Sequence, residues 1–520
     1  MIHFHGRTCL LAVFLILNLS TMRSEAQSTS PAVLTPDTKI ATLPIGDNGS
    51  SVDFTLRQLM DALHVPGLSL AVIDNYKIVW AKGYGVTESG GSTPVTTKTL
   101  FQAGSISKPV AATGALWLVE HGKLALDENV NDKLKTWKIP DNEFTATQKV
   151  TLRRLMSHSA GLTVHGFPGY AADEPVPTLV QIFNGEKPAN TAPIRLDFVP
   201  GSQFRYSGGG VTIEQQLVID VTGEPFPKFM RDTVLSKAGM SDSTYEQPLP
   251  ARLVSQAASG TRSGGQMVGG RYHTYPEMAA AGLWTTPTDL AKFAIEIALS
   301  KQGKANHILS QKMTQEMLTP QIKADDDFVG LAFFIDSKEP DRFGHDGSDE
   351  GFQALLTMSA DSGKGLAVMG NSDAFFQVAP HVVDLIAKTY GWKPRPEQHN
   401  MRELFTLALN RGGTQSALDV YARAKDGKLP GYKVDENALI GLGYMLLQQK
   451  KTDNAIKVFQ RNVQDYPKYW NAYDSLAEAY LNAGNTKEAI ANYEKSVELN
   501  PKNDNGIAAL KKLRETTVSK

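Results

Sequence analysis

Ser105 and Lys108 stand three residues apart in the stretch FQAGSISKPVAATGAL, residues 101–116. If a helix begins near Ser105, this spacing places both side chains on one helix face, beside the unpaired backbone N–H groups of the first turn. The lysine amine can then take the serine proton, and the positive helix end favours the negative charge that develops. Pro109 suits the first turn because proline has no backbone N–H. The pair predicts a serine nucleophile, although S-x-x-K also occurs by chance on ordinary helices.

Two later stretches carry residue types that complete this chemistry. In FVPGSQFRYSGGG, Tyr206 would become a proton acceptor if the lysine lies nearby, because an ammonium group lowers the pKa of a phenol. A packing role is the alternative for this tyrosine. In RFGHDGSDEGFQALL, His345 and Gly347 precede a strand, where glycine lets a substrate lie against the strand edge. The backbone N–H of Ser348 would be one oxyanion donor and that of Ser105 the other.

These residues must be positioned by the helices and strands that the hydrophobic pattern predicts. Helical spacing of apolar residues indicates a helix over 53–64, one from Ser105 to about Gly122, several short helices between about 150 and 310, and one over 378–392. Strands are predicted at 67–74, 77–85, 329–336, 352–360 and 365–373. Because the strands lie at both ends of this region and the helices in its middle, we expect one antiparallel sheet with a helical insertion.

The composition is that of a soluble globular protein. A chain of 520 residues is long enough for about two to four domains. Lys and Arg (53 residues) nearly balance Asp and Glu (54 residues), so the charge does not indicate nucleic acid or an anionic membrane as a partner. The histidines lack H-E-x-x-H spacing, and neither a metal nor another cofactor is expected.

Residues 1–26 have the composition of an export signal. Arg7 supplies positive charge, an apolar run extends over 9–19, and residues 24–26 offer small side chains for cleavage. The run is too short for an ordinary membrane anchor. The only cysteine, Cys9, lies in this segment, so the mature chain would contain no disulfide. We expect an exported protein, periplasmic or secreted, in which the Ser-, Thr- and Pro-containing residues 27–52 form a flexible lead-in.

A polar, proline-containing break at 393–400 predicts a linker, and a repeat follows over 401–520. Three positions recur 34 residues later with matching residue types: Ala455, Phe459 and Pro467 correspond to Ala489, Tyr493 and Pro501. This period resembles the tetratricopeptide repeat, with an unrelated helical bundle as the alternative. Since helical repeats typically offer a concave binding surface, the resemblance implies a protein partner.

Three motifs in chain order resemble those of the class C β-lactamase and penicillin-binding-protein family of serine hydrolases. They correspond to the family's S-x-x-K, Y-x-N and K-T-G/H-x-G motifs. Framing segments such as PGLSLAVID, LMSHSAGL and GLWTTPTDLAKF extend the resemblance over residues 53–392. It implies an α+β fold, in which an antiparallel sheet flanked by helices carries a helical subdomain, followed here by the all-α repeat domain.

The resemblance also implies roles for single residues. Ser105 would attack a carbonyl group and become acylated, while Lys108 and Tyr206 would share the proton transfers, with the choice of base left open. His345 would face the carboxylate or leaving group of the substrate. Residues 347 and 348 would line the strand edge. His158, in LMSHSAGL, is expected to be a hydrogen-bonded structural residue.

Two positions depart from the family pattern and bear on the substrate. Gly208 stands where the Y-x-N motif has Asn, and a site without that polar partner discriminates weakly in favour of an amide-bearing substrate. His345 stands where many members have Lys, and a neutral histidine provides no fixed charge for a carboxylate. We therefore expect an esterase, a D-aminopeptidase or carboxypeptidase, or a weak β-lactamase. The alternative is a degenerate domain that binds a peptide or cell-wall ligand while the repeats recruit a partner.

Overall fold

The computed structural model describes residues 34–46, 49–393 and 400–518. The predicted export signal at 1–26 and most of the predicted linker at 393–400 lie outside these residues. Among the described residues, none of the helices combines the length and the apolar composition that a membrane span requires.

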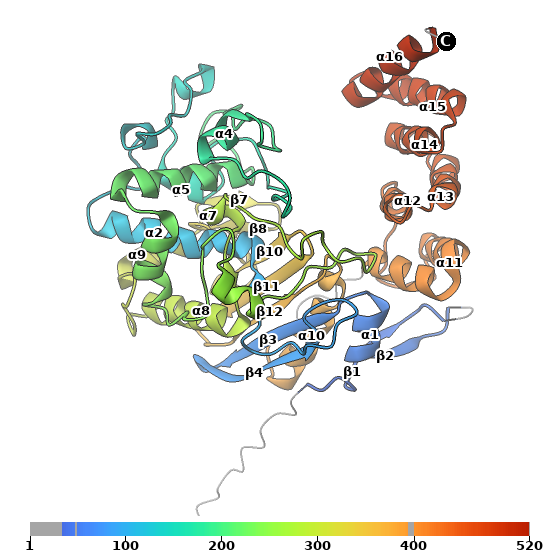
Figure 1. The fold of residues 1–520 in the computed structure, drawn as a ribbon. Coiled ribbons are helices and arrows are strands. Elements are labelled where there is room, and N and C mark those ends of the chain that lie inside the picture. Colours follow the sequence, from blue (N-terminus) through green and yellow to red (C-terminus); the bar gives the residue numbers. More distant parts are fainter. Residues whose placement is uncertain (1–33, 47–48, 394–399, 519–520) are drawn as a thin grey trace, which may run out of the picture. The chain divides into compact units, whose positions relative to one another are not determined.

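An eight-stranded antiparallel sheet forms the centre of the N-terminal domain, in the order β4-β3-β12-β11-β10-β9-β8-β7 (Figure 1). Its strands are β3 (Gly67–Asp74), β4 (Lys77–Gly85), β7 (Ile322–Ala324), β8 (Asp327–Val329), β9 (Phe334–Ile335), β10 (Arg342–Asp349), β11 (Phe352–Ser359) and β12 (Gly365–Gly370). The early strand β3 pairs with the late strand β12. This pairing confirms the prediction of a single antiparallel sheet built from both ends of the domain.

The predicted strand at 329–336 is wrong in one respect, because the chain divides it into β8 and β9. Between them Gly330 donates its N–H to the carbonyl of Phe333, and the φ angle of Ala332 is +71°. A side-chain carbon at Gly330 would lie 2.4 Å from the carbonyl oxygen of Met317. The segment therefore turns against α9 instead of continuing as a strand.

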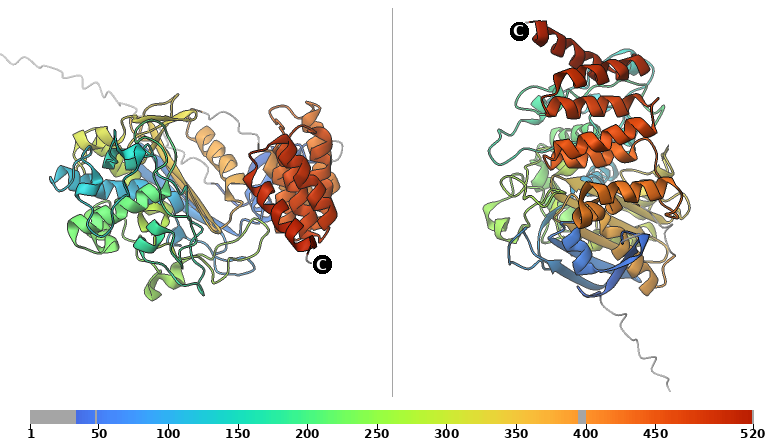
Figure 2. Two further views of the ribbon diagram at one scale, coloured as in Figure 1. Left: turned by 90° about the horizontal axis from the view of Figure 1, so that it is seen from above. Right: turned by 90° about the vertical axis from the view of Figure 1, so that its right-hand side faces the viewer.

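Helices cover the sheet and form the insertion between β4 and β7. They are α1 (Leu56–Ala62), α2 (Ser107–Glu120), α3 (Leu152–Met156), α4 (Leu179–Asn184), α5 (Gly208–Thr222), α6 (Phe226–Met230), α7 (Met278–Ala281), α8 (Pro287–Lys301), α9 (Gln311–Met317) and α10 (Ala379–Thr389). Helix α8 packs against β3, β4, β11 and β12, and Figure 2 shows α10 on the opposite side of the sheet. The short 3-10 turn η2 (Gly104–Ile106) runs directly into α2, as the Ser105 pattern predicts.

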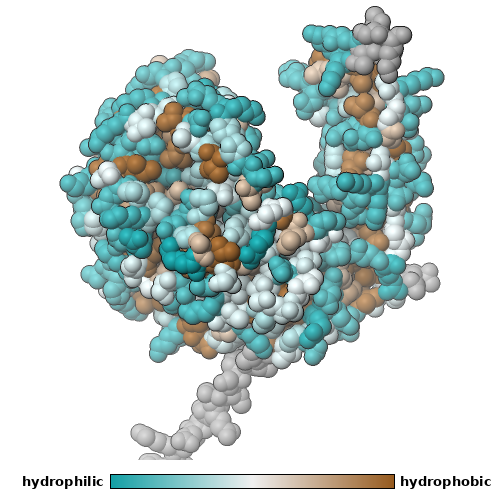
Figure 3. All heavy atoms as spheres, viewed as in Figure 1, coloured by the Kyte–Doolittle hydropathy of each residue, from teal (hydrophilic) through white to brown (hydrophobic). Residues whose placement is uncertain are grey.

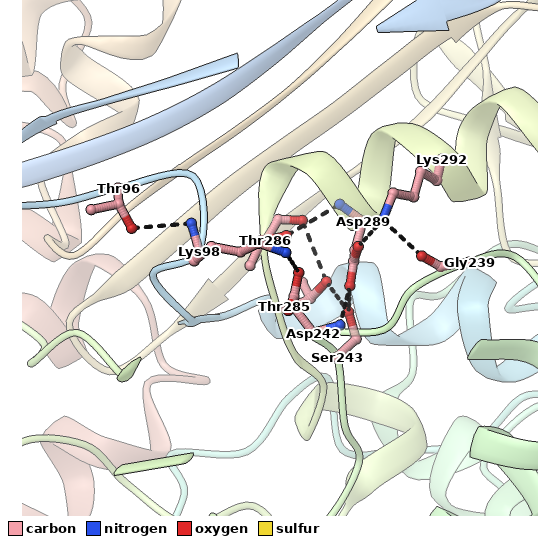
Figure 4. Close-up of polar contacts among 9 residues, drawn as sticks. All are labelled: Thr96, Lys98, Gly239, Asp242, Ser243, Thr285, Thr286, Asp289 and Lys292. Carbon is pink, nitrogen blue, oxygen red and sulfur yellow. Dashed lines mark hydrogen bonds and ion pairs between the residues drawn. The ribbon is translucent and has the colours of Figure 1, made fainter. Parts of the chain in front are cut away.

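A buried carboxylate, Asp289, ties the start of α8 to a strand pair whose first strand leads into η2 (Figure 4). This pair consists of β5 (Phe101–Gln102) and β6 (Trp284–Thr285). The carboxylate accepts hydrogen bonds from the Ser243 hydroxyl at 2.9 Å and the Lys292 ammonium at 2.8 Å. The Ser243 and Thr285 hydroxyls share a further bond of 2.7 Å. These contacts hold β6, the pairing partner of the strand that leads into Ser105, close to the helix that covers the sheet.

The expectation that residues 27–52 are a flexible lead-in is wrong for Lys39–Leu43. These residues form β1, which pairs antiparallel with β2 (Val52–Thr55). Ala41 and Leu43 alternate along β1 and are both buried, and Lys39 forms a 2.7 Å ion pair with Asp53. Alternating apolar residues favour a strand once a surface is present to bury them.

The C-terminal region is all helical, as its repeat predicts. Its helices are α11 (Met401–Lys425), α12 (Ala438–Gln448), α13 (Thr452–Asp465), α14 (Trp470–Asn482), α15 (Thr486–Leu499) and α16 (Asp504–Val518). Each helix packs against the next one in sequence, and the orange-to-red ribbon of Figure 2 shows them stacked. In Figure 3, the visible face of these helices is mainly hydrophilic, with small separated apolar areas.

Candidate active site

Ser105 and Lys108 are in direct contact, at the junction of η2 and α2. The Lys108 Nζ atom lies 2.9 Å from the Ser105 hydroxyl and donates a second hydrogen bond to the Ala280 carbonyl at 2.8 Å. The lysine is 2% exposed, and its burial lowers the pKa of the ammonium to about 7, an effect that the charge of Asp349 opposes. At neutral pH about half of an amine with this pKa is in the neutral form that can accept a proton.

The turn that carries Ser105 is anchored by Ser107. The Ser107 hydroxyl donates to the Gly104 carbonyl at 2.6 Å and accepts the Leu283 N–H at 3.0 Å. The Tyr245 hydroxyl donates to the Ser107 carbonyl at 2.7 Å. The φ angle of Gly104 is +50°, a conformation that favours glycine. These hydrogen bonds fix the backbone conformation of the turn that contains Ser105.

Tyr206 lies beside this pair, just before α5. The Lys108 Nζ atom is 5.0 Å from the centroid of the Tyr206 ring, and the Tyr206 hydroxyl faces Ser105 without completing a hydrogen bond. The expectation that the lysine lowers the pKa of this phenol is wrong. Burial of the hydroxyl raises its pKa, and this effect outweighs the contact with Ser105. Tyr206 therefore remains a protonated hydrogen-bond donor at neutral pH.

His158 and His165 hold the Tyr206 ring in place. Their ring centroids are 4.2 Å and 4.9 Å from that of Tyr206. His158 Nδ1 accepts the Ser207 N–H at 3.2 Å, and the His158 carbonyl accepts the Arg205 N–H at 2.9 Å. His158 thus binds the backbone on both sides of Tyr206, a structural role of the kind that its framing motif predicts.

Strand β10 brings the third motif to the opposite side of the cleft. β9 pairs with β10 only as far as Gly344, so among the described residues the segment 345–348 has a strand partner on the β11 side alone. A side-chain carbon at Gly347 would lie 1.9 Å from the Ala103 carbonyl oxygen and 3.2 Å from the Ser105 nitrogen. Only glycine permits this approach, which places the backbones of Ser105 and Ser348 side by side.

His345 is buried and neutral. Burial, together with the nearby Lys108 ammonium, lowers the pKa of its imidazole to about 3. Its Nδ1 contacts the Asp346 carbonyl, and its Nε2 has no hydrogen-bond partner among the described residues. His345 therefore offers a substrate a neutral hydrogen-bonding group and no fixed positive charge.

A cleft of about 890 Å³ opens over the serine. Its lining includes Ser105, Tyr206, His345, Gly347, Ser348 and the aromatic rings of Phe204, Phe334 and Phe376. Gly208, which the sequence assigns to substrate binding, is buried and does not line this cleft. Its N–H bonds the His165 carbonyl at 3.0 Å, and a side-chain carbon there would lie 3.1 Å from the Phe167 ring. The loop at 165–167 thus occupies the space that a larger residue at 208 would need.

Two features of the site were not identified from the sequence. The segment Asp325–Asp327 lines the cleft between β7 and β8, although no motif marks it. Asp349 is buried at the end of β10, and the alternation of β10 provides a signal for it, since every second residue from His345 faces inward. Among the described residues there is no group of three or more His, Cys, Asp or Glu side chains arranged to hold a metal ion.

Comparisons with known proteins agree with this geometry. The sequence model described as Beta-lactamase matches residues 52–390, which is more than half of the chain. The chain belongs to the beta-lactamase family. Models of the tetratricopeptide repeat match residues 437–469 and 470–503 of this beta-lactamase family member.

Individual relatives match parts of the chain. A protein named beta-lactamase from Pseudomonas fluorescens is 32% identical over 199 residues, covering 38% of this chain and 51% of the relative. Penicillin-binding protein 4 of Amycolatopsis lactamdurans is 31% identical over 187 residues, covering 35% and 45%. The chain thus spans about half the length of the curated relatives it matches.

Solved structures share the fold. An octameric penicillin-binding protein homologue from Pyrococcus abyssi superposes with a TM-score of 0.55 at 23% identity, covering 65% of this chain and 76% of that one. A penicillin-binding protein from Bacillus halodurans superposes with a TM-score of 0.51 at 22% identity, covering 63% and 98%. These comparisons confirm the α+β fold expected from the three motifs.

Proposed function

We propose that this family member is an active serine hydrolase that forms an acyl-enzyme with an ester or amide. The observation that carries the proposal is the 2.9 Å contact between Lys108 Nζ and the Ser105 hydroxyl, in a cleft that also contains Tyr206. A nucleophile in contact with a base of suitable pKa is what acyl transfer requires.

In the proposed reaction, neutral Lys108 takes the Ser105 proton as the serine oxygen bonds to the substrate carbonyl carbon. The N–H groups of Ser105 and Ser348 bind the oxyanion. When the bond to the leaving group breaks, the Lys108 ammonium returns the proton to that group. Water then attacks the acyl-enzyme, Lys108 accepts its proton and Ser105 regains it. Tyr206 supports these steps as a hydrogen-bond donor, because burial keeps its phenol protonated.

The favoured substrates are esters or small amides without an obligatory carboxylate. Neutral His345 supplies no fixed charge for a carboxylate, and Gly208 supplies no side chain for a substrate amide. An esterase or D-aminopeptidase activity is therefore favoured over an efficient β-lactamase or carboxypeptidase activity. Aromatic rings at 204, 334 and 376 provide apolar contact surface for the acyl group.

A panel of p-nitrophenyl esters, D-amino acid amides and penicillins tests the proposal. Wild-type protein is expected to hydrolyse at least one ester, to react with a fluorophosphonate at Ser105 and to lose both properties in Ser105→Ala. Ser202→Ala, which removes an exposed hydroxyl, is the matched control. Binding of the panel compounds without turnover or Ser105 labelling would instead favour the degenerate binding module that the departures at 208 and 345 suggest.

Two further inferences concern the cellular location of the protein and the role of its repeats. We infer from the composition of residues 1–26 that the protein is exported to the periplasm or secreted. We further infer that the tetratricopeptide repeats bind a protein partner, since stacked helical repeats present extended surfaces. Cell fractionation with and without residues 1–26 tests the first inference, and affinity capture with and without residues 437–503 tests the second.

A further inference from the structure

The catalytic cleft continues well beyond the serine, along β10 and across β9 to the turn between β7 and β8. Its lining extends from Ser105 to Asp327. β8 pairs with β9 and β9 with β10 near Arg342, whereas Gly347 lies against the serine turn at the other end of β10. Because a strand rises about 3.3 Å per residue and neighbouring strands lie about 4.8 Å apart, about 15 to 20 Å separate the two ends. The cleft is therefore long enough for an extended acyl group.

The far end of the cleft is lined by carboxylates. Asp325 and Asp326 form the exposed turn between β7 and β8, and Asp327 is the first residue of β8. Asp327 accepts the Ser337 N–H at 3.1 Å, and Asp336 lines the same end. The side chains of Asp325 and Asp326 form no hydrogen bond or ion pair with other described residues. These two carboxylates are therefore available to a ligand.

The basic residues at this end do not cancel its negative charge. Arg342 is paired with Glu339, a carboxylate that also forms a 3.0 Å ion pair with Lys393. Among the described residues that line the cleft, the exposed Lys338 remains as the cation that opposes the aspartates. An excess of one charge inside a cleft raises the local concentration of ligands with the opposite charge. The acidic end should therefore attract a cationic group.

His345, between the serine and the acidic end, provides a second and independent observation about the ligand. Its side chain lines the cleft, and the residue is 5% exposed. The Asp346 carbonyl can only accept a hydrogen bond, so the Nδ1 atom that contacts it carries the proton, and Nε2 of the neutral ring is an acceptor. Nε2, on the other side of the ring, has no partner among the described residues. An N–H or ammonium group of a substrate would satisfy this atom, whereas a carboxylate would not.

We propose that the aspartates at 325–327 form a subsite for a cationic group, and that the preferred substrate has an extended, peptide-like acyl part with an ammonium group about 15 to 20 Å from the scissile carbonyl. The acyl part runs over Phe334, on the strand between the two ends, and donates an N–H to His345. An extended chain advances about 3.5 Å per residue, so three residues and a lysine side chain reach the acidic end. Turnover of this substrate rests on the proposed hydrolase function, whereas binding of the cation does not.

Three matched esters test the charge preference. They are N-acetylated p-nitrophenyl esters of triglycine preceded by lysine, norleucine or glutamate, and the glycines avoid a choice of stereochemistry next to the ester. The KM of the lysine ester is expected to be about fivefold lower than that of the norleucine ester, and the KM of the glutamate ester higher than both. The kcat values should be similar, because a remote contact is made equally in the ground state and the transition state. Added salt should reduce the difference in KM, since it screens exposed charges.

Asp325→Asn combined with Asp326→Asn removes the charge of the turn and keeps the size of both side chains. The φ angle of Asp325 is +49°, a conformation that asparagine also adopts. In this double variant the ratio of kcat/KM for the lysine ester over the norleucine ester should fall from about fivefold to about one. Asp173→Asn, which changes an exposed aspartate outside the cleft, should retain the wild-type ratio. A wild-type ratio near one, or a ratio that persists in the double variant or in high salt, would overturn the proposal.

Binding measurements separate the subsite from the proposed function. Absence of Ser105-dependent hydrolysis of all three esters would refute the proposed function. Titration calorimetry with the corresponding lysine and norleucine peptide amides would still decide the subsite: tighter binding of the lysine amide that is lost in the double aspartate variant would support it, and equal binding of the two amides would refute it. Hydrolysis of the three esters with the same KM would instead refute the subsite and leave the hydrolase function in place.

Discussion

The hydrolase domain and the repeat region place their functional surfaces by opposite means. In the repeats, each helix packs against its neighbour in sequence, and the 34-residue period alone indicates that arrangement. In the hydrolase domain, the cleft joins Ser105, Tyr206 and Gly347, which lie far apart in the chain. A substitution in the repeats should therefore affect only the neighbouring helices, whereas a substitution at the cleft should displace segments that are distant in the chain.

The largest effect is expected from Lys108→Met. Loss of the base should lower kcat/KM for a p-nitrophenyl ester by about 10³-fold, while the circular dichroism spectrum stays unchanged. Lys123→Met, an exposed lysine shortly after α2, is the control. Activity within a few-fold of the wild type in Lys108→Met would show that the contact with Ser105 is not catalytic.

Gly347→Ala tests whether the cleft depends on contact between distant backbones. The added methyl group would collide with the Ala103 carbonyl oxygen, 1.9 Å away, and push β10 from η2. Because a displacement of about 1 Å can cost a factor of about 100 in rate, kcat should fall by about that factor. Gly269→Ala, where the methyl group meets no atom within 4 Å, is the matched control. Equal kcat values for both variants would contradict the strand-edge arrangement.

Gly443→Ala is the corresponding test in the repeats. A methyl group at this position of α12 would lie 2.2 Å from the Phe459 ring on α13, and such overpacking should cost about 2 kcal/mol of local stability. Faster hydrogen exchange confined to the helices around α12 and α13 is the expected result, with ester hydrolysis unchanged. Gly441→Ala, on the same helix with no atom within 4 Å, should show neither change. A loss of ester hydrolysis in Gly443→Ala alone would break the contrast between the two regions.

The pH dependence tests the cleft without any substitution. Burial lowers the pKa of Lys108 to about 7, and acylation requires its neutral form. Below that pKa the neutral fraction falls tenfold per pH unit, so kcat/KM should rise with pH and level off above about pH 7. The wild-type pH profile between pH 5 and 9 checks this sign. A profile that is flat across pH 7 would mean that Lys108 is not the base.

The sequence-based predictions succeed where a short stretch determines its own geometry. The i,i+3 spacing of Ser105 and Lys108 correctly places their side chains together, and the strands predicted at 67–74 and 77–85 form β3 and β4. The prediction of the Tyr206 pKa fails because burial outweighs the neighbouring charge. The prediction of a flexible lead-in fails at Lys39–Leu43, where pairing with β2 creates a strand.

The sequence by itself determines which reactive side chains are present, which helix carries the nucleophile and which period the repeats follow. Tertiary structure decides the rest of the site. It brings β10 against η2, places the Ala280 carbonyl on the Lys108 amine and buries that amine away from water, all through contacts between segments more than a hundred residues apart. The physical reason is that spacing along a helix or strand acts over a few residues, whereas desolvation and charge proximity depend on what the whole fold places around a group.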